Sequence, residues 1–93
     1  MEGSLCLTHA NLEDANLSNC NLSDANLTGA CLKNADLHQA GLALTNLSGV
    51  DFTGANVKEA RLWHDAGIPN NVKEDLTQRG AIFDENIEKI HRD

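Results

Sequence analysis

The sequence predicts an all-β solenoid, a square coil of about three turns that is closed at its C-terminal end by a short α-helical cap. Three observations lead to this prediction. A large apolar residue stands at every fifth position from Leu7 to Leu62, a small or modest residue precedes each by two positions, and the period stops at Trp63. Repetition at a fixed period is typical of solenoid architectures. The predicted structural core therefore consists of Leu7, Leu12, Leu17, Leu22, Leu27, Leu32, Leu37, Leu42, Leu47, Phe52, Val57 and Leu62.

The five-residue period excludes both regular alternatives. In an α-helix of about 3.6 residues per turn, a step of five advances by about 500°, so the leucines would drift around the helix. In a flat strand the side chains alternate with period two, so an odd repeat would send successive leucines to opposite faces. Each unit must therefore contain a bend and form one side of a square. Four units make a turn of twenty residues, and the twelve units between residues 5 and 64 make three coils.

The second inward position of each unit is small because four large side chains converge on the axis of a narrow tube. Alanine lets them interdigitate at crystal-like density, so we expect Val50 beside Phe52 to be the tightest place in the coil. Asn and Asp suit the bends, since their short side chains hydrogen-bond nearby backbone and tolerate unusual φ values. Gly29, Gly49 and Gly54 add backbone freedom at other corners.

The units resemble the pentapeptide-repeat family, whose pattern is Ala, then Asp or Asn, then Leu, then two variable residues. Residues 10–14 read Ala-Asn-Leu-Glu-Asp, residues 25–29 read Ala-Asn-Leu-Thr-Gly and residues 35–39 read Ala-Asp-Leu-His-Gln. The resemblance covers all twelve units and implies a right-handed quadrilateral β-helix, with the small residue and the central Leu or Phe pointing inward. The departures are Leu5, Cys20, Thr45 and Val50 at the small position, and Cys6, Cys31, Gly41 and Arg61 in place of Asn or Asp.

The chain divides into an N-terminal lead of residues 1–4, the repeat region of residues 5–64 and a C-terminal cap of residues 65–93. We expect one short helix from Asn70 to Gln78, with Asn70 or Asn71 as N-cap and Gly80 in the left-handed C′ position. Asp84 is the predicted N-cap of a second helix, which would contain Ile87 and Ile90. Helices this short need support, and the uppermost apolar layer of the coil lies nearest.

The cap region resembles appendages of cyanobacterial pentapeptide-repeat proteins in its Gly-Ile-Pro and Arg-Gly-Ala-Ile-Phe segments. Nothing comparable precedes the first unit, so the first layer is expected to expose apolar atoms and unpaired backbone groups. We predict a homodimer through this uncapped N-terminal coil, across a two-fold axis. Two alternatives stay open: Met1 and Leu5 fold across the end of a monomer, or residues upstream have been lost.

One side of the coil is unusually apolar. Positions twenty apart place Ala43 and Trp63 in one outward column with Leu44 beside them, which makes these three residues a candidate docking patch for an unknown protein partner. The alternative, which we favour, is that the C-terminal segment folds back over this side, because its apolar helix edges lie close by in sequence.

The sequence predicts no enzyme. Catalysis needs a nucleophile, a base and an orienting group at one point, whereas His9, His38 and His64 fall on three different sides of the coil. Cys6 and His9 share a side, but two ligands are a weak metal site, and a metal-dependent or thiol enzyme ranks third among our hypotheses. We therefore expect no catalytic residues, no cofactor and no metal.

Composition bears on compartment. The start of the chain lacks a signal peptide or a membrane span, and three cysteines are a poor disulfide framework, so we expect a cytoplasmic protein that does not bind a membrane.

Charge bears on partners. The net charge of −7 disfavours direct nucleic-acid binding. The first hypothesis for function is a non-catalytic interaction module that contacts proteins. The second follows from the resemblance, because some pentapeptide-repeat proteins are regarded as DNA mimics that inhibit type II topoisomerases such as gyrase. The six acids of the repeat region, interspersed with three bases, make a thin negative surface that a soluble protein would also show.

Overall fold

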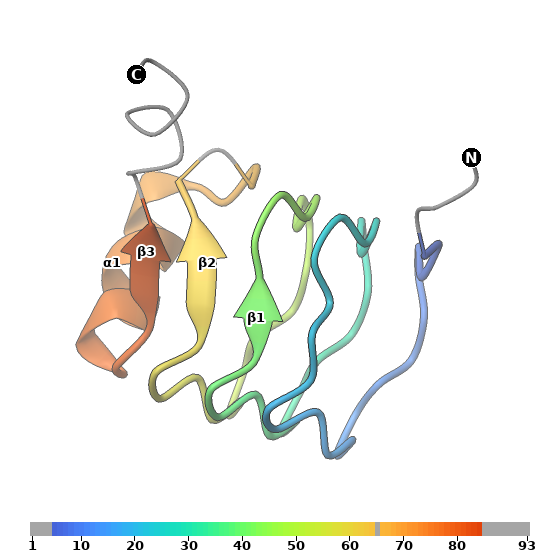
Figure 1. Cartoon of the computed structure of the whole chain (residues 1–93), viewed down its shortest axis with the longest axis horizontal. Coiled ribbons are helices and arrows are strands. Elements are labelled where there is room, and N and C mark those ends of the chain that lie inside the picture. Colours follow the sequence, from blue (N-terminus) through green and yellow to red (C-terminus); the bar gives the residue numbers. More distant parts are fainter. Residues whose placement is uncertain (1–4, 65, 85–93) are drawn as a thin grey trace.

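The protein is a stack of coils with a helix across one end (Figure 1). The computed structural model describes residues 5–64 and 66–84. Its regular elements are β1 (Gly41–Leu42), β2 (Arg61–Trp63), α1 (Asn70–Gln78) and β3 (Ile82–Asp84). The three strands form one parallel sheet in the order β1-β2-β3. The N-terminal coil lies at one end of the stack, and α1 and β3 lie at the other.

Backbone ladders join positions twenty residues apart, as the sequence predicts. Parallel bridges pair Cys6 with Asn26 and Asn26 with Asn46, and the same step recurs on the other sides. Within each step, one residue uses both of its backbone groups on the coil before it. The N–H of Asn26 donates to the carbonyl of Leu5 at 2.9 Å, and its carbonyl accepts from Leu7 at 2.8 Å. The solenoid fold is therefore confirmed, and we call residues 5–24, 25–44 and 45–64 the N-terminal, middle and C-terminal coils.

Each coil has four sides, which we number along the chain. Side one comprises residues 5–9, 25–29 and 45–49, and the following sides succeed it in steps of five residues. Side two of the C-terminal coil is thus residues 50–54, and side four contains β1 and β2.

Most corners share one construction. Asn or Asp at the second position of a unit accepts a hydrogen bond from the backbone N–H two residues later, as Asn11 does from Glu13 at 3.1 Å. The last residue of the unit takes a positive φ, near +60° to +70°, at eleven corners. Gly29, Gly49 and Gly54 fit this requirement without strain, whereas Leu44 adopts φ +61° with a branched side chain. The corner prediction is therefore confirmed for the glycines.

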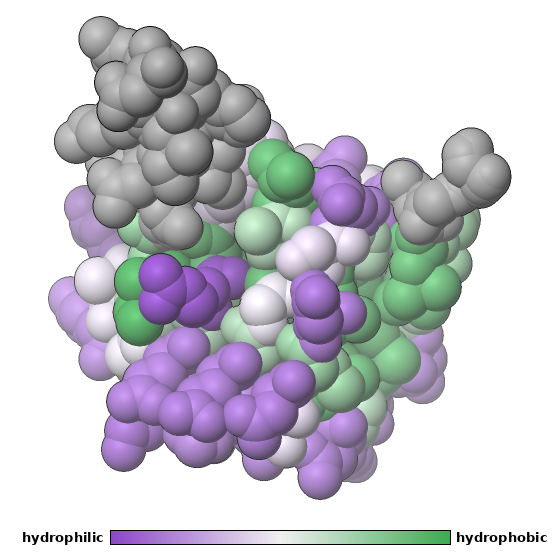
Figure 2. Space-filling model, viewed as in Figure 1, coloured by the Kyte–Doolittle hydropathy of each residue, from purple (hydrophilic) through white to green (hydrophobic). Residues whose placement is uncertain are grey.

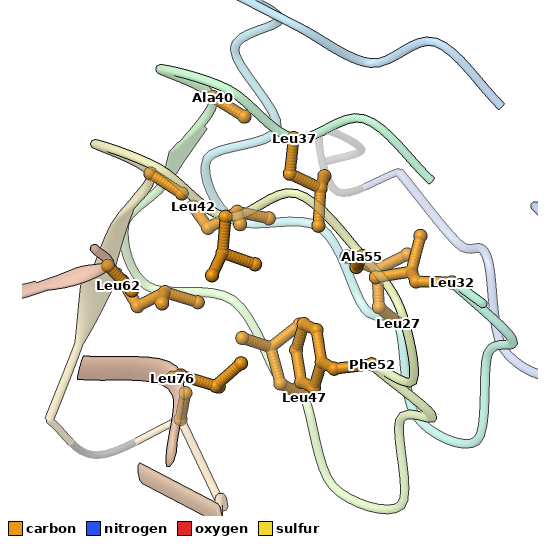
Figure 3. Packing of buried hydrophobic residues seen from close by; sticks show 14 of the residues in the cluster. Leu27, Leu32, Leu37, Ala40, Leu42, Leu47, Phe52, Ala55, Leu62 and Leu76 are labelled. Atoms are coloured by element: carbon orange, nitrogen blue, oxygen red, sulfur yellow. The ribbon is translucent and has the colours of Figure 1, made fainter. Parts of the chain in front are cut away.

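The core follows the predicted inward positions, but burial differs between layers. The central leucines of the middle coil, with Leu47 and Leu62 of the C-terminal coil, are at most 1% exposed, and they converge on the axis (Figure 3). The equivalent residues of the N-terminal coil are only partly buried. These are Leu7, Leu12, Leu17 and Leu22. Every unit keeps its register, and the difference arises because no described residue lies beneath the first layer.

The residues after Trp63 build an incomplete fourth layer. The carbonyl of Ala66 accepts from Leu47 at 2.7 Å on side one, and the carbonyl of Gly80 accepts from Glu59 at 2.8 Å on side three. Between them α1 crosses the end of the tube and places Leu76, which is 0% exposed, over the core. Lys73 ties the helix to side four, because its Nζ donates to the carbonyl of His64 at 3.0 Å and lies 5.7 Å from the centre of the Phe83 ring.

The ends of α1 confirm one cap prediction and correct another. Gly80 has φ +104°, and the N–H groups of Gly80 and Ala81 donate to Thr77 and Leu76, which is the Schellman arrangement. The predicted N-cap was wrong. Pro69 occupies that position with extended backbone and no side-chain cap, so Asn70 and Asn71 lie inside the helix. The φ that the proline ring fixes is compatible with the entry into a helix, so the chain turns helical directly after Pro69.

Strand β3 (Ile82–Asp84) pairs with β2 and was not predicted from the sequence; Asp84, the predicted N-cap of a second helix, belongs to this strand. One expectation about the C-terminal coil needs correction. Val50 is half-buried rather than tightly packed, because no strand formed by the described residues 66–84 lies over side two. The predicted helix containing Ile87 and Ile90 lies outside the described residues. None of the helices in the described part of the chain is long and apolar enough to cross a membrane.

Candidate functional site

The backbone edge at the N-terminal end is the largest unpaired feature among the described residues. We call it the open edge. In the middle and C-terminal coils, the second residue of each unit bonds to the coil before it. In the N-terminal coil, the N–H and C=O groups of the same residues point away from the middle coil. Four N–H and eight C=O groups lie there without a backbone partner in residues 5–64 and 66–84. The N–H groups belong to Cys6, Asn11, Asn16 and Asn21, and the additional carbonyls to Thr8, Glu13, Ser18 and Ser23.

Apolar side chains accompany this edge. The four leucines of the N-terminal coil are half-buried, and Leu5 is 52% exposed. Figure 2 shows apolar surface along the N-terminal end of the stack, on the side away from the helix. Unpaired strand edges combined with exposed apolar atoms favour pairing with another chain.

The predicted docking patch is divided in the structure. Leu44 is 46% exposed, whereas Trp63 is half-buried and its Nε1 donates to the carbonyl of Thr45 at 2.7 Å. Ala43, directly after β1, is half-buried. A hollow of about 230 Å³ borders Leu44 and Trp63 at the corner of sides four and one.

The described part of the C-terminal segment does not cover Leu44. Helix α1 lies across the end of the tube, and β3 extends side four, adding Ile82, which is 42% exposed. Figure 2 shows the apolar areas of this face as separate spots with polar atoms between them. Whether Ala43, Leu44 and Trp63 act as a docking patch therefore stays a prediction.

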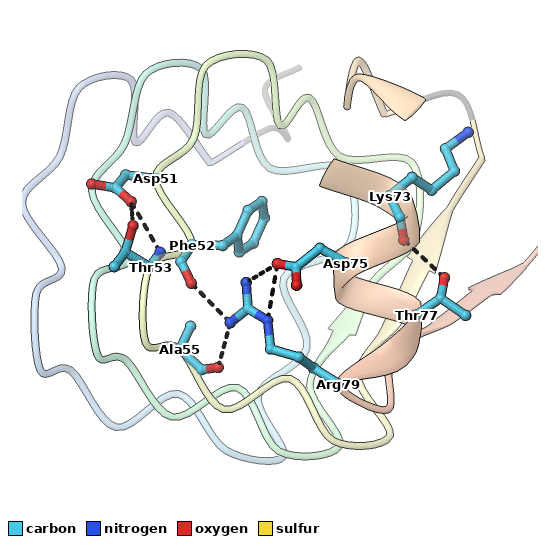
Figure 4. Close-up of polar contacts among 8 residues, drawn as sticks. All are labelled: Asp51, Phe52, Thr53, Ala55, Lys73, Asp75, Thr77 and Arg79. Carbon is cyan, nitrogen blue, oxygen red and sulfur yellow. Dashed lines mark hydrogen bonds and ion pairs between the residues drawn. The ribbon is translucent and has the colours of Figure 1, made fainter. Parts of the chain in front are cut away.

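A second candidate site lies between α1 and side two of the C-terminal coil. Val50, Phe52 and Val72 line a groove of about 570 Å³, which Asp75 and Arg79 close at one end. Arg79 spans from the helix to the coil: Nη1 donates to the carbonyls of Phe52 and Ala55 at 3.1 Å, while Nη2 donates to Asp75 at 2.7 Å (Figure 4). This pair was not predicted from the sequence, although an acid and a base four residues apart on a helix are a recognisable signal.

Two exposed titratable groups have shifted pKa values among the described residues. The backbone N–H of Thr8, and then its hydroxyl, lower the pKa of the exposed Cys6 thiol. The Thr53 hydroxyl, and then its N–H, lower the pKa of Asp51 beside the groove. The His9 ring lies over Gly29 of the next coil, since a Cβ on that glycine would meet the ring at 2.6 Å. Within residues 5–64 and 66–84, no three His, Cys, Asp or Glu side chains gather to hold a metal ion.

Comparison with known proteins gives one family. A family model described as pentapeptide repeats matches eight copies within residues 6–42 and 31–62. No curated protein matches this chain significantly.

Two solved structures are similar to the chain. A pentapeptide repeat protein from the Arabidopsis thaliana thylakoid lumen is 30% identical, with 62% of this chain and 43% of that chain covered and a TM-score of 0.42. A pentapeptide repeat protein from Nostoc Pcc 7120 is 27% identical, with 85% and 84% covered and a TM-score of 0.36. The matched region thus spans less than half of the Arabidopsis protein.

Proposed function

Because the chain belongs to the pentapeptide-repeat family, we propose that it is a non-catalytic interaction module, a right-handed quadrilateral β-helix that acts through protein–protein contacts. Its first contact is with a second copy of itself, through the open edge. The observation that carries this proposal is the row of four N–H and eight C=O groups on that edge without backbone partners among the described residues.

The open edge has the geometry that self-pairing needs. In an antiparallel pair, two opposite residues exchange both N–H···O=C bonds. Four residues of the open edge point both their N–H and their C=O groups outward, so each can exchange two hydrogen bonds with a strand of a second copy. These residues are Cys6, Asn11, Asn16 and Asn21. A two-fold axis lying parallel to one side of the square makes every strand run antiparallel to the one it meets. The same rotation brings the two half-buried leucine layers into contact.

Charge opposes this pairing and makes it sensitive to salt. The N-terminal coil carries Glu13, Asp14 and Asp24, and no lysine or arginine occurs before Lys33. Two copies therefore bring like charges together, and added salt screens the repulsion over about 10 Å at 0.1 M. The contact area of one coil end is small for a protein interface, so we expect a dissociation constant on the order of 10 μM.

Sedimentation over a range of concentrations tests the proposal. We expect a monomer–dimer equilibrium that tightens as salt rises. Asn16→Pro deletes one edge N–H, which has no partner within residues 5–64 and 66–84 of the protomer, and should weaken the dimer about tenfold. Asn16→Ser, which keeps the N–H, is the matched control. A monomer at every concentration, or a dimer unaffected by Asn16→Pro, contradicts pairing through this edge.

The second candidate is a DNA-mimicking inhibitor of gyrase. What supports it is the net charge of −7 and the family. The distribution of charge weakens it, because side one of all three coils carries no Asp, Glu, Lys or Arg, and Lys33, Lys58 and Arg61 interrupt the acids elsewhere. A supercoiling assay with purified gyrase decides: we expect no inhibition at micromolar protein, and inhibition would favour the mimic.

We also propose the cytoplasm as the site of action. Cys6, Cys20 and Cys31 are free thiols, and a reducing compartment preserves such thiols. Fractionation of the native cells with detection of the protein tests this, and recovery from an oxidising compartment contradicts it.

A further inference from the structure

The four sides of the C-terminal coil are covered unequally. Side one receives a ladder bond from Leu47 to Ala66, side three receives one from Glu59 to Gly80, and side four carries the whole of β3. Side two, residues 50–54, has no strand of the fourth layer over it in the part of the chain that the structure describes. Helix α1 connects side one to side three across the end of the tube, and it therefore does not lie on top of side two (Figure 4).

The backbone groups on this uncovered side have a known register. One coil below, the carbonyl of Ala30 accepts from Asp51 at 3.1 Å, while Leu32 and Asn34 donate to the next coil at 2.9 and 2.8 Å. The equivalent groups of the C-terminal coil are the carbonyl of Val50 and the N–H groups of Phe52 and Gly54. None of the three has a backbone partner among the described residues. These groups are one acceptor and two donors. They have the same spacing as the groups with which each lower coil binds the parallel strand of the coil above it.

A groove lies directly beside these groups. Val50, Phe52 and Val72 give it apolar walls, and Ile68 and Pro69 continue them toward side one. At the other end Arg79 is fixed by two coil carbonyls and by Asp75. A strand lying over side two would turn its inward side chain into this groove, because the inward position of every lower layer faces the same direction.

We propose that side two of the C-terminal coil is a docking site for an extended peptide segment of a partner protein, which adds a parallel strand to the fourth layer. This mode of recognition uses main-chain hydrogen bonds for affinity and side-chain pockets for specificity. The site is separate from the open edge, which lies at the opposite end of the stack.

The surroundings define the chemistry of the peptide. Its backbone must be extended, since a helix would have no free groups for Val50, Phe52 and Gly54. Its inward residue is apolar, to match Val50, Phe52 and Val72. A basic residue two positions after the one that donates to Val50 would lie near the exposed carboxylate of Asp51, as Lys33 does from the coil below. Asp75 adds little to this attraction because Arg79 already neutralises it.

The chain itself supplies the probe. A synthetic peptide of residues 28–36, with serine in place of Cys31, has the sequence of side two of the middle coil, including Leu32 and Lys33. We expect it to bind the full chain with a dissociation constant on the order of 100 μM, measured by fluorescence polarisation. In amide NMR spectra the signals of Phe52 and Gly54 should shift and their hydrogen exchange should slow.

Matched peptides and variants isolate the contact. N-methylation at the position of Cys31 removes the donor to Val50 and should weaken binding at least tenfold, whereas N-methylation at Lys33, whose N–H takes no part in the ladder, should not. On the protein, Val72→Asp should abolish binding, and Asn71→Asp, with the same charge on an exposed neighbour, should not. Thermal melts confirm that both variants fold.

Three results would overturn the inference. They are no binding at millimolar peptide, an affinity that neither N-methylation changes, and amide NMR shifts confined to residues 6–23. The last result would place the peptide on the open edge and leave the proposed self-association intact. Conversely, a strictly monomeric protein whose Phe52 and Gly54 signals shift with peptide would keep this inference and remove the other.

Discussion

The two ends of the stack are built from the same repeat but are finished differently. At the C-terminal end, α1 places Leu76 over the upper layer, and Ala66, Gly80 and β3 pair with three of its four sides at least in part. At the N-terminal end, the same inward leucines are half-buried, and the backbone edge has no partner among the described residues. Since each coil in a solenoid is stabilised by its neighbours, the comparison teaches that the burial that stabilises the fold is concentrated at the C-terminal end.

The largest expected effect is the loss of a core side chain at the capped end. Leu76→Ala should lower the free energy of unfolding by about 2–5 kcal/mol, because it leaves a cavity beneath the helix where the side chain is fully buried. Leu12→Ala in the half-buried layer is the matched control, and it should cost about 1 kcal/mol. Urea denaturation at low protein concentration measures both. Equal costs would mean that the N-terminal layer is as well covered as the C-terminal one.

The end of the helix should be the next most sensitive feature. Gly80→Ala places a Cβ at φ +104°, 3.2 Å from the Cα of Lys58, and should cost about 1–2 kcal/mol. Gly41→Ala is the control, because its φ is not in the left-handed region and an added Cβ approaches nothing closer than 3.9 Å. Thermal unfolding compares them. A neutral Gly80→Ala would show that the cap does not depend on the Schellman geometry.

A smaller effect of opposite sign is expected at a corner of side four. Leu44 adopts φ +61° and is nearly half exposed, so Leu44→Asn should stabilise the fold by about 0.5–1 kcal/mol. Leu42→Asn, at the buried inward position of the same five-residue unit, should instead be strongly destabilising. Differential scanning calorimetry measures both changes. A destabilised Leu44→Asn would indicate that Leu44 makes a contact that the monomer lacks.

The smallest effect concerns the thiol at the open edge. Because Thr8 lowers the pKa of Cys6, its thiolate persists to lower pH, and the pH profile of its alkylation by iodoacetamide should lie below that of an ordinary thiol. Thr8→Ala removes the hydroxyl and should move the profile back toward higher pH by part of the shift. Mass spectrometry of labelled peptides follows each cysteine, with half-buried Cys31 as the internal control. An unchanged profile in Thr8→Ala would exclude the hydroxyl as a cause.

The repeat region could be predicted from its residues because its determinants are local. Leu27, Leu32 and Leu37 lie inward wherever the five-residue step is kept, and Asn11 satisfies its own corner two residues later. The candidate sites were harder to predict from the sequence. The open edge followed from the lack of a visible cap in the sequence, whereas the groove beside Val50 was missed, because the five-residue pattern predicted tight packing there.

The sequence by itself determined the solenoid, its twenty-residue turn, the inward side chains, and the place where the repeat ends. A five-residue period permits only one arrangement of these features, so no distant contact is needed to derive them. The tertiary structure alone decided that Pro69 is the N-cap of the helix, that residues 82–84 extend the sheet, and that Arg79 reaches Phe52 while no described residue pairs with side two from above. These features depend on how a segment without a repeat meets the end of the coil, and such contacts between distant residues leave no periodic trace in the chain.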